Sequence, residues 1–323
     1  MIVRFFITPA FSLQGIFYPK ENFMYKYINL FSGIGGWELG LQDLPMENVL
    51  SCEIDKYARQ TFLANFPDLP CVKNNNYPTD IRELNPQDIP EFDILVGSPP
   101  CQSFSMAGLR KGLKDEKDDK GNMFFYVLNI IKQRRPKAFI LENVKGLLTA
   151  EGGRSFRVIH DLFRNAGYSF HYKVIKGCDC GIPQIRQRVF MVGFRGENQE
   201  TSTFKFPDPV PLKFTMRDVF RCETCNRDIG CTVMTHSSGK KFGQPHNSEY
   251  YLVDGVPRKI TIEESQKIMG IPDDFIFPVP KSQRYKQLGN GIIPDCVRLV
   301  GQSVVKYLQD NIMEYYNLVT CES

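Results

Sequence analysis

One stretch constrains the fold of this 323-residue chain more than any other. Lys26–Phe31 is predicted to be a strand, Ser32–Gly36 is a glycine-rich turn, and Trp37–Leu44 is predicted to be a short helix. A second strand is predicted over Asn48–Cys52, and Glu53 follows it directly. A strand, a glycine turn, a helix, a strand and an acidic residue form the mononucleotide-binding βαβ unit. The sequence therefore predicts an α/β fold with a Rossmann-like sheet.

The same unit predicts a nucleoside cofactor. Glu53 stands 18 residues after Gly35, where a carboxylate accepts hydrogen bonds from ribose hydroxyls. NAD and S-adenosylmethionine both suit this arrangement, but Gly40 falls one residue late for a full G-x-G-x-x-G, which argues against a dinucleotide. Asp80 can accept from an adenine amino group, and Ile81 can cover the ring face. The alternatives are a plain tight turn at the glycines and a turn cap at Asp80.

A cysteine stands where a nucleophile would suit the fold. The apolar run Ile94–Val96 predicts a buried strand, and Gly97–Pro100 ends it, because prolines cannot donate to a sheet. Cys101 follows beyond the carboxyl end of that strand, where open α/β sheets bind their ligands. The polar, glycine-punctuated segment Gln102–Gly121 is predicted to be a lid. The alternative is a small buried hydrophobic residue, the commoner role of a free cysteine.

A glutamate and two arginines are further candidates. Glu142 follows the predicted strand Ala138–Leu141 at the same sheet edge as Cys101, where partial burial raises a carboxyl pKa toward that of a general acid. Arg186 and Arg188 alternate along the chain, so both face one side and suit a phosphate or a base carbonyl. The alternatives are a strand-end charge that reaches solvent and a solvated arginine edge.

The composition changes at Gly196, where a second, smaller unit is predicted. Residues 196–259 are polar and rich in prolines, and their nine Lys/Arg against eight Asp/Glu do not by themselves identify nucleic-acid binding. The basic loop Thr235–Asn247 can enter the major groove of DNA, and its alternative is a plain surface loop. The unit also contains Cys222, Cys225, Cys231 and His236. Their spacing differs from a standard pair of zinc knuckles, so we predict no metal.

The last part of the chain is predicted to return to the first domain. Thr261–Glu264 is a capping box that opens a short helix, and Gln287–Gly291 is predicted to be a loop. A final helix carries one apolar face, formed by Val297, Val300, Val304 and Leu308.

The composition of the chain limits which classes of protein it can belong to. The net charge of +4 is compatible with a polyanionic partner, and no apolar run is long enough for a membrane span. Ten cysteines at irregular spacing favour a reducing compartment over a disulfide framework. Residues 1–23 are apolar and aromatic, and we expect them either to come from an upstream start codon or to form a loosely attached arm, in both cases outside the fold.

Taken in order, the motifs of residues 27–308 resemble those of the DNA cytosine-5 methyltransferases. The matching segments are FSGIGG at 31–36, EIDKYA at 53–58, SPPCQSFS at 98–105, ENVKGL at 142–147, QIRQR at 184–188, RKITIEES at 258–265 and QLGNG at 287–291. The resemblance implies a Rossmann-like S-adenosylmethionine-dependent domain over 24–195. It further implies a small, mostly irregular or β target-recognition domain and hinge over 196–283, and a return to the first domain over 284–323.

The resemblance also implies the chemistry. Cys101 would add to carbon 6 of a flipped-out cytosine, which activates carbon 5 toward the methyl group of S-adenosylmethionine. Glu142, protonated, would bind N3 of the base. Arg188 would bind its O2 and lower the pKa of the cysteine, while Arg186 would help to hold the loop or the backbone.

Further contacts follow only from the resemblance and the loop composition. The implied cofactor contacts are Phe31, Ser32, Gly33, Ile34, Gly35, Gly36, Glu53, Ile54, Asp80, Ile81, Ser98, Pro99, Met123 and Asn290. The implied DNA contacts are Gln102, Ser103, Thr232, Lys240, Lys241 and Gln244. Three positions depart from the family: Ile54 replaces an aromatic residue, Gly291 replaces a serine, and Val233 replaces a leucine. The same alignment makes Cys231 an ordinary core residue, which argues against zinc.

As partners, the resemblance implies duplex DNA and a cognate restriction endonuclease, with a monomeric enzyme in the cytoplasm of a bacterial or phage-infected cell. Three alternatives stay open. The first is a tRNA cytosine-5 methyltransferase of the same architecture, although its typical Cys-Phe-Thr tripeptide is not found in this sequence. The second is a catalytically idle DNA-binding relative, and the third is a nucleotide-dependent oxidoreductase.

Overall fold

A computed structural model describes residues 24–100, 123–236, 242–244 and 248–321. The strands are β1 (Tyr25–Leu30), β2 (Met46–Cys52), β3 (Ile94–Gly97), β4 (Ala138–Val144), β5 (His171–Lys176), β6 (Gln187–Phe194), β7 (Tyr250–Val253) and β8 (Val256–Lys259). The α-helices are α1 (Gly36–Leu41), α2 (Lys56–Asn65), α3 (Pro70–Lys73), α5 (Met123–Arg134), α6 (Arg154–Asn165), α7 (Met216–Phe220), α8 (Ile262–Lys267), α9 (Lys281–Asn290) and α10 (Pro294–Cys321). Short 3-10 turns are η1 (Ile81–Glu83), η2 (Pro86–Asp88), η4 (Lys145–Leu148), η5 (Ala150–Gly153) and η6 (Gly177–Asp179).

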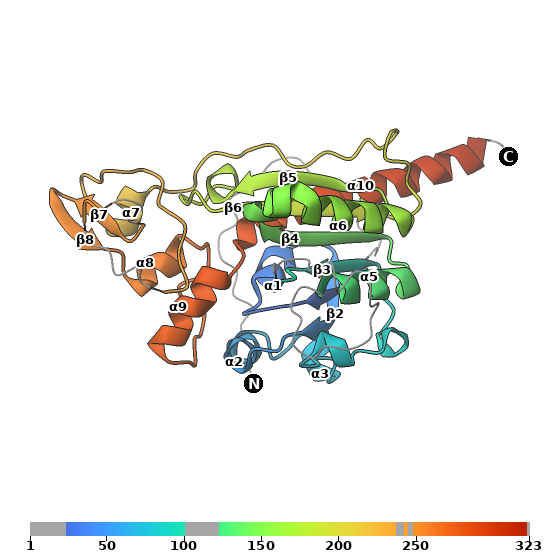
Figure 1. The fold of residues 1–323 in the computed structure, drawn as a ribbon, viewed down its shortest axis with the longest axis horizontal. Coiled ribbons are helices and arrows are strands. Elements are labelled where there is room, and N and C mark those ends of the chain that lie inside the picture. The colour runs from blue at the N-terminus through green and yellow to red at the C-terminus, as the bar shows by residue number, and fades with distance from the viewer. Residues whose placement is uncertain (1–23, 101–122, 237–241, 245–247, 322–323) are drawn as a thin grey trace.

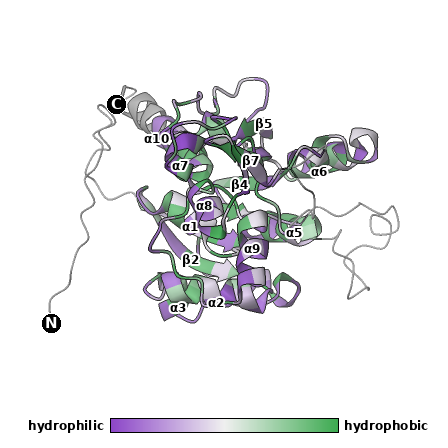
Figure 2. Ribbon diagram, turned by 90° about the vertical axis from the view of Figure 1, so that its left-hand side faces the viewer, coloured by the Kyte–Doolittle hydropathy of each residue, from purple (hydrophilic) through white to green (hydrophobic). Residues whose placement is uncertain are grey.

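A six-stranded sheet forms the centre of the large lobe (Figure 1). Its order is β2-β1-β3-β4-β6-β5, with the first four strands parallel and β6 antiparallel to both of its neighbours. The strands alternate their apolar residues between two cores: α1 and α10 cover one face, and α5 and α6 cover the other. Figure 2 shows β4 and α5 as mostly hydrophobic, whereas α9 carries mostly hydrophilic residues. The predicted α/β fold is confirmed.

Helix α1 packs closely on the start of α10. A Cβ at Gly36 would lie 2.6 Å from Ile292 Cγ2, and a Cβ at Gly40 would lie 2.6 Å from Val297 Cβ. Val297, with Val300 and Val304, is fully buried, so the predicted apolar face of the last helix is confirmed. The close approach of the two helices therefore requires glycine on α1.

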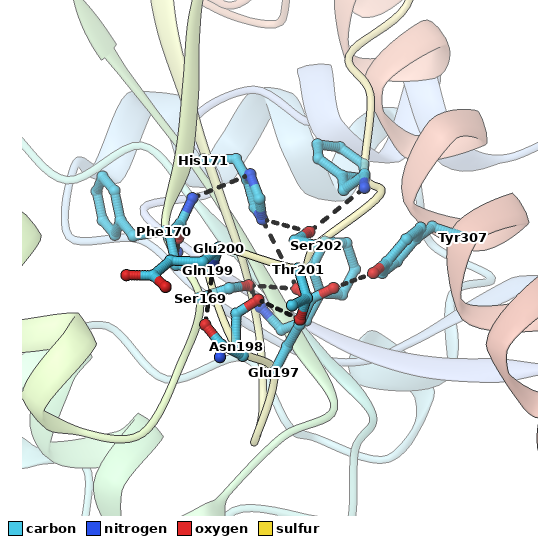
Figure 3. A network of polar contacts seen from close by, with 12 residues as sticks. Ser169, Phe170, His171, Glu197, Asn198, Gln199, Glu200, Thr201, Ser202 and Tyr307 are labelled. Carbon is cyan, nitrogen blue, oxygen red and sulfur yellow. Dashed lines mark hydrogen bonds and ion pairs between the residues drawn. The ribbon is translucent and has the colours of Figure 1, made fainter.

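A smaller lobe lies beside the sheet and holds α7, α8, α9 and the antiparallel β7-β8 hairpin (Figure 1). The chain reaches it over the segment that follows β6, and Figure 3 shows how that segment is fastened to the edge strand β5 and to α10. Glu197 accepts hydrogen bonds from Ser169 and from the Tyr307 hydroxyl, and Ser202 Oγ lies 3.0 Å from His171 Nε2. Burial is the main cause that lowers the pKa of His171, and the nearby Glu197 carboxylate acts in the opposite direction.

Several predicted elements differ from the structure in their bounds, and the helix predicted over Trp37–Leu44 ends at Leu41. Two further differences concern the candidate site. Gln287–Gly291 was expected to be a loop, but Gln287–Asn290 form the last turn of α9, and the Gly291 N–H donates to the Gln287 carbonyl. The predicted strand Ala138–Leu141 continues to Val144, because β6 pairs with it as far as Val144 opposite Arg188. The capping box at Thr261 is confirmed: its hydroxyl accepts from the Glu264 N–H, and the Glu264 carboxylate accepts from the Thr261 N–H.

Candidate active site

The glycine loop after β1 contains three residues in left-handed backbone conformations. Phe31, Gly33 and Gly35 all have positive φ, at 65°, 57° and 95°. A Cβ on Gly35 would lie 2.1 Å from the ring of Phe66, so glycine is required there both by its conformation and by its packing.

Glu53 fastens this loop to the exit of β2. Its Oε2 accepts a hydrogen bond of 2.8 Å from the Gly33 N–H, and its Oε1 accepts one of 2.8 Å from the Asp55 N–H. Burial raises the pKa of Glu53, while these two bonds act in the opposite direction. The carboxylate is therefore held in one orientation at the mouth of the loop.

A pocket of about 540 Å³ opens at this edge of the sheet, within the range that encloses small-molecule ligands. The predicted cofactor residues that line it are Phe31, Gly33, Ile34, Glu53, Ile54, Asp80, Ile81, Ser98, Met123 and Asn290. Ser32, Gly35, Gly36 and Pro99 are not among its lining residues. Sequence reasoning missed Cys52, Asp55, Ala58, Thr79, Arg82, Pro100, Lys286 and Gln287 as pocket residues. Gln287 is the first residue of the recognised QLGNG motif, and Lys286 directly precedes it.

Asp80 acts as the turn cap that was the alternative for it, and it also lies at the pocket wall. Its carboxylate accepts from the Arg82 N–H at 2.9 Å and forms an ion pair with the Arg82 guanidinium at 2.6 Å. The bond to this side chain is the main cause that lowers the pKa of Asp80. Next to it, Ile81 is buried, whereas Ile54 is 63% exposed at the opening.

Glu142 lies inside β4 and does not reach solvent, which excludes the alternative of an exposed strand-end charge. It is 6% exposed, and its Oε1 lies 2.9 Å from Arg188 Nε. The two residues are diagonal neighbours across the antiparallel β4-β6 pair, so their side chains share one face. Burial raises the pKa of Glu142 despite the opposing effect of Arg188, followed by Arg186. Burial therefore favours the protonated form of this carboxyl more than water does.

Arg186 is 2% exposed and binds backbone rather than another side chain. Its guanidinium donates to the carbonyls of Val233, Gly289 and Gly291 at 3.2, 2.7 and 2.8 Å. Burial lowers the pKa of Arg186 to about 9, which still leaves it charged at neutral pH. The arginine alternation thus places one guanidinium on Glu142 and the other on three carbonyls, and neither forms a solvated edge.

Strand β3, which leads to Cys101, ends beside the pocket and beside the strand that carries Glu142. Trp37 Nε1 donates to Ser98 Oγ at 3.1 Å, Asn143 Nδ2 donates to the Pro99 carbonyl at 2.8 Å, and Pro100 lines the pocket. Cys101 itself lies outside the described residues, as do Gln102, Ser103, Lys240 and Lys241. Thr232 is half-buried at the edge of the smaller lobe, and Gln244 is exposed.

Among the described residues, no group of three or more His, Cys, Asp or Glu side chains is arranged to hold a metal ion. Cys231 is half-buried, with its thiol beside the Arg227 guanidinium, so the expected core position is wrong for it. The described cysteines are free thiols, and no helix in the described part of the chain is long and apolar enough to cross a membrane.

An open, mostly parallel sheet with a glycine loop and a pocket at the carboxyl ends of its strands, lined by the fixed carboxylate of Glu53, is typical of a nucleoside-cofactor-dependent α/β protein. The model of the C-5 cytosine-specific DNA methylases matches residues 25–241 and 218–306. The chain belongs to this family.

Two relatives are similar over most of their length. The chain is 35% identical to the Type II methyltransferase M.SsoII of Shigella sonnei, over 90% of this chain and 83% of the relative. It is 39% identical to the Type II methyltransferase M.NgoBI of Neisseria gonorrhoeae, over 83% and 89%. Among solved structures, DNMT2 of Spodoptera frugiperda is similar in fold, with a TM-score of 0.63 at 21% identity over 88% of this chain and 99% of that one.

This protein is therefore a DNA cytosine-5 methyltransferase that transfers the methyl group of S-adenosylmethionine to carbon 5 of cytosine. Formation of a covalent cysteine adduct and flipping of the base are general to its family. The family match favours this function over the three alternatives, which were a tRNA methyltransferase, a catalytically idle DNA-binding relative and a nucleotide-dependent oxidoreductase.

Proposed function

We propose that Cys101, Glu142 and Arg188 carry the methyl transfer in this chain. The observation that supports this most is the buried Glu142–Arg188 pair, in which Glu142 lies on β4, the strand next to the one that leads to Cys101, and Arg188 lies on β6 beyond it. A protonated carboxyl at Glu142 would donate to N3 of the cytosine, and Arg188 would donate to O2 and hold that carboxyl in place.

The proposed reaction proceeds by addition and elimination. The Cys101 thiolate adds to carbon 6, which makes carbon 5 nucleophilic, and the hydrogen bond from Glu142 stabilises the charge that develops at N3. S-adenosylmethionine, when bound, supplies an electrophilic methyl group. After carbon 5 has taken that group, loss of its proton to a base allows the sulfur–carbon 6 bond to break, which releases Cys101.

The pocket residues fit the cofactor. Its volume of about 540 Å³ suits a nucleoside with a short side chain, and the fixed carboxylate of Glu53 faces it as an acceptor for ribose hydroxyls. Asp80 and Ile81 would contact the adenine, with Ile54 covering it more weakly than an aromatic residue would. Asn290 and Met123 would complete the site.

We further propose the domain boundaries and the DNA contacts. Residues 24–195 and 284–323 would form the catalytic domain, and 196–283 would read the target sequence. The contacts proposed for DNA are Gln102, Ser103, Thr232, Lys240, Lys241 and Gln244. Since the relatives are named as Type II methyltransferases, we also propose a cognate restriction endonuclease as the functional counterpart of the enzyme. As the family resemblance implies, the enzyme would work as a monomer in the cytoplasm.

The test is Cys101→Ser with labelled S-adenosylmethionine and plasmid DNA. We expect methyl transfer to be lost and cofactor binding to stay near normal, because a hydroxyl is a far weaker nucleophile than a thiolate at neutral pH. The unchanged enzyme should form a denaturation-resistant complex with DNA that carries 5-fluorocytosine, because fluorine blocks elimination. Turnover by Cys101→Ser, or a complex that dissociates on denaturation, would contradict the covalent step.

A further inference from the structure

The backbone of Val233 is held at both of its polar groups by side chains from the other lobe. The Val233 N–H donates to Gln184 Oε1 at 3.2 Å, and the Val233 carbonyl accepts from Arg186 NH1 at 3.2 Å. All three residues are buried, at 9% exposure or less. Hydrogen bonds in such a place are not shared with water, so they fix the position of Val233.

The Gln184 side chain and the backbone on either side of it are also held by hydrogen bonds. Its amide Nε2 donates to the Ile268 carbonyl at 2.6 Å and lies 3.3 Å from Met269 Sδ, and the residue is fully buried. Its neighbours pair with Gly230 of the smaller lobe: the Gly230 N–H donates to the Pro183 carbonyl at 2.8 Å, and the Ile185 N–H donates to the Gly230 carbonyl at 3.0 Å. The side chain therefore has one orientation in which both of its bonds are made.

Helix α9 closes the other side of the same segment. A Cβ at Gly289 would lie 2.3 Å from the Thr235 backbone nitrogen and 2.5 Å from the Met234 carbonyl carbon. Arg186 also donates to the Gly289 and Gly291 carbonyls, on either side of Asn290, which lines the cofactor pocket. The segment 232–235 is thus held between the approach to β6 and the last turn of α9.

We propose that Gln184 is a positioning residue for target recognition. It acts by fixing Val233, and through it Thr232 and Met234, relative to the Glu142–Arg188 pair. This inference rests on the proposal that residues 196–283 read the target. Because Gln184 contacts neither the pocket nor Glu142 in the described structure, its loss should alter the DNA that is accepted and leave the chemical step intact.

The experiment compares Gln184→Met with the unchanged enzyme, after the target has been found by bisulfite sequencing of a methylated plasmid. Methionine keeps the length of the side chain and removes both hydrogen bonds. We expect KM for target DNA to rise about tenfold, and discrimination against sites with one altered base pair to fall about tenfold, with kcat within about threefold. S-adenosylmethionine should bind as before.

Gln266→Met is the matched control. Gln266 is 3% exposed, and its amide bonds to the Pro272 carbonyl and to Arg284 rather than to segment 232–235. It should lower thermal stability to a similar extent and leave discrimination unchanged. The proposal is overturned if both variants lose discrimination equally, or if Gln184→Met lowers kcat and keeps KM and discrimination.

A second variant covers the case in which Gln184→Met does not fold. Gln184→Glu keeps an oxygen that accepts from the Val233 N–H, and a folded preparation is recognised by its binding of S-adenosylmethionine. Its discrimination should lie closer to that of the unchanged enzyme than to complete loss, and the reverse result counts against the proposal. The covalent step fails separately, because methylation by Cys101→Ser would contradict that step and leave the role of Gln184 intact.

Discussion

At the scale of a single residue, Glu38 is a carboxyl buried in the core of the large lobe. It lies on α1, next to the glycine loop, and is 2% exposed. Its Oε1 accepts from Asn29, Asn48 and Ser51, whereas its Oε2 has no partner among the described residues. Burial raises the pKa of Glu38 from 4.5 to about 7, so the carboxyl is partly protonated at neutral pH.

This raised pKa makes stability depend on pH in a defined direction. A carboxyl with a folded-state pKa above its unfolded value stabilises the fold when protonated, and that contribution is lost as the pH rises from 4.5 through about 7. Glu38→Gln should therefore gain stability relative to the unchanged protein by about 2 kcal/mol between about pH 5.5 and about pH 8. Urea unfolding at the two pH values measures this, and an advantage that stays constant with pH would contradict it.

Glu53 belongs to the same scale, and its prediction concerns affinity. Glu53→Ala removes the proposed acceptor for ribose hydroxyls together with the bonds to the Gly33 and Asp55 N–H groups. We expect binding of S-adenosylmethionine to weaken by about 1.5–3 kcal/mol, the range for hydrogen bonds to a charged group. Calorimetry measures it, and DNA affinity without cofactor is the control. An equal loss of both affinities would mean that Glu53 supports the fold instead.

At the scale of elements, the sequence predicted what local pattern determines. The βαβ unit of residues 26–55, the apolar face of α10 and the capping box at Thr261 follow from periodicity and from single hydrogen bonds between near neighbours. The last turn of α9 could not be predicted in this way. It is supported by tertiary contacts, among them the bond from Thr61 to Gln287 and the ion pair of Lys286 with Asp55.

The residues of the candidate site also separate into those that local sequence pattern predicts and those that depend on tertiary contacts. Glu53 and Glu142 could be predicted because each directly follows a predicted strand. Arg188 could be predicted because it belongs to the QIRQR motif. The role of Gln184 could not, because its partner Val233 lies 49 residues away in the sequence. The resemblance implied that Arg186 holds the loop or the backbone, but only the folded chain shows which three carbonyls it binds.

At the scale of the whole molecule, the proposed division of catalysis and recognition between the two lobes leads to an exchange experiment. Replacing residues 196–259 by those of a relative with a known, different target should transfer that target, because the large lobe is committed to cofactor and chemistry. Bisulfite sequencing of a plasmid methylated by the chimera measures the outcome. The unchanged enzyme and the donor relative are the controls. An active chimera that keeps the original target would place recognition elsewhere, first of all in residues 102–121.

The contact between α1 and the start of α10 joins two regions that are made at very different times on the ribosome. The glycine loop is among the first parts of the fold to be synthesised, yet Gly36 rests on Ile292 and Gly40 on Val297. Gln287 and Asn290, which line the pocket, are also late. Such long-range closure is slow compared with local folding. A nascent chain therefore cannot complete its cofactor pocket until the segment that holds Gln287, Asn290 and Val297 has emerged from the ribosome, so methylation cannot begin before that segment has been translated.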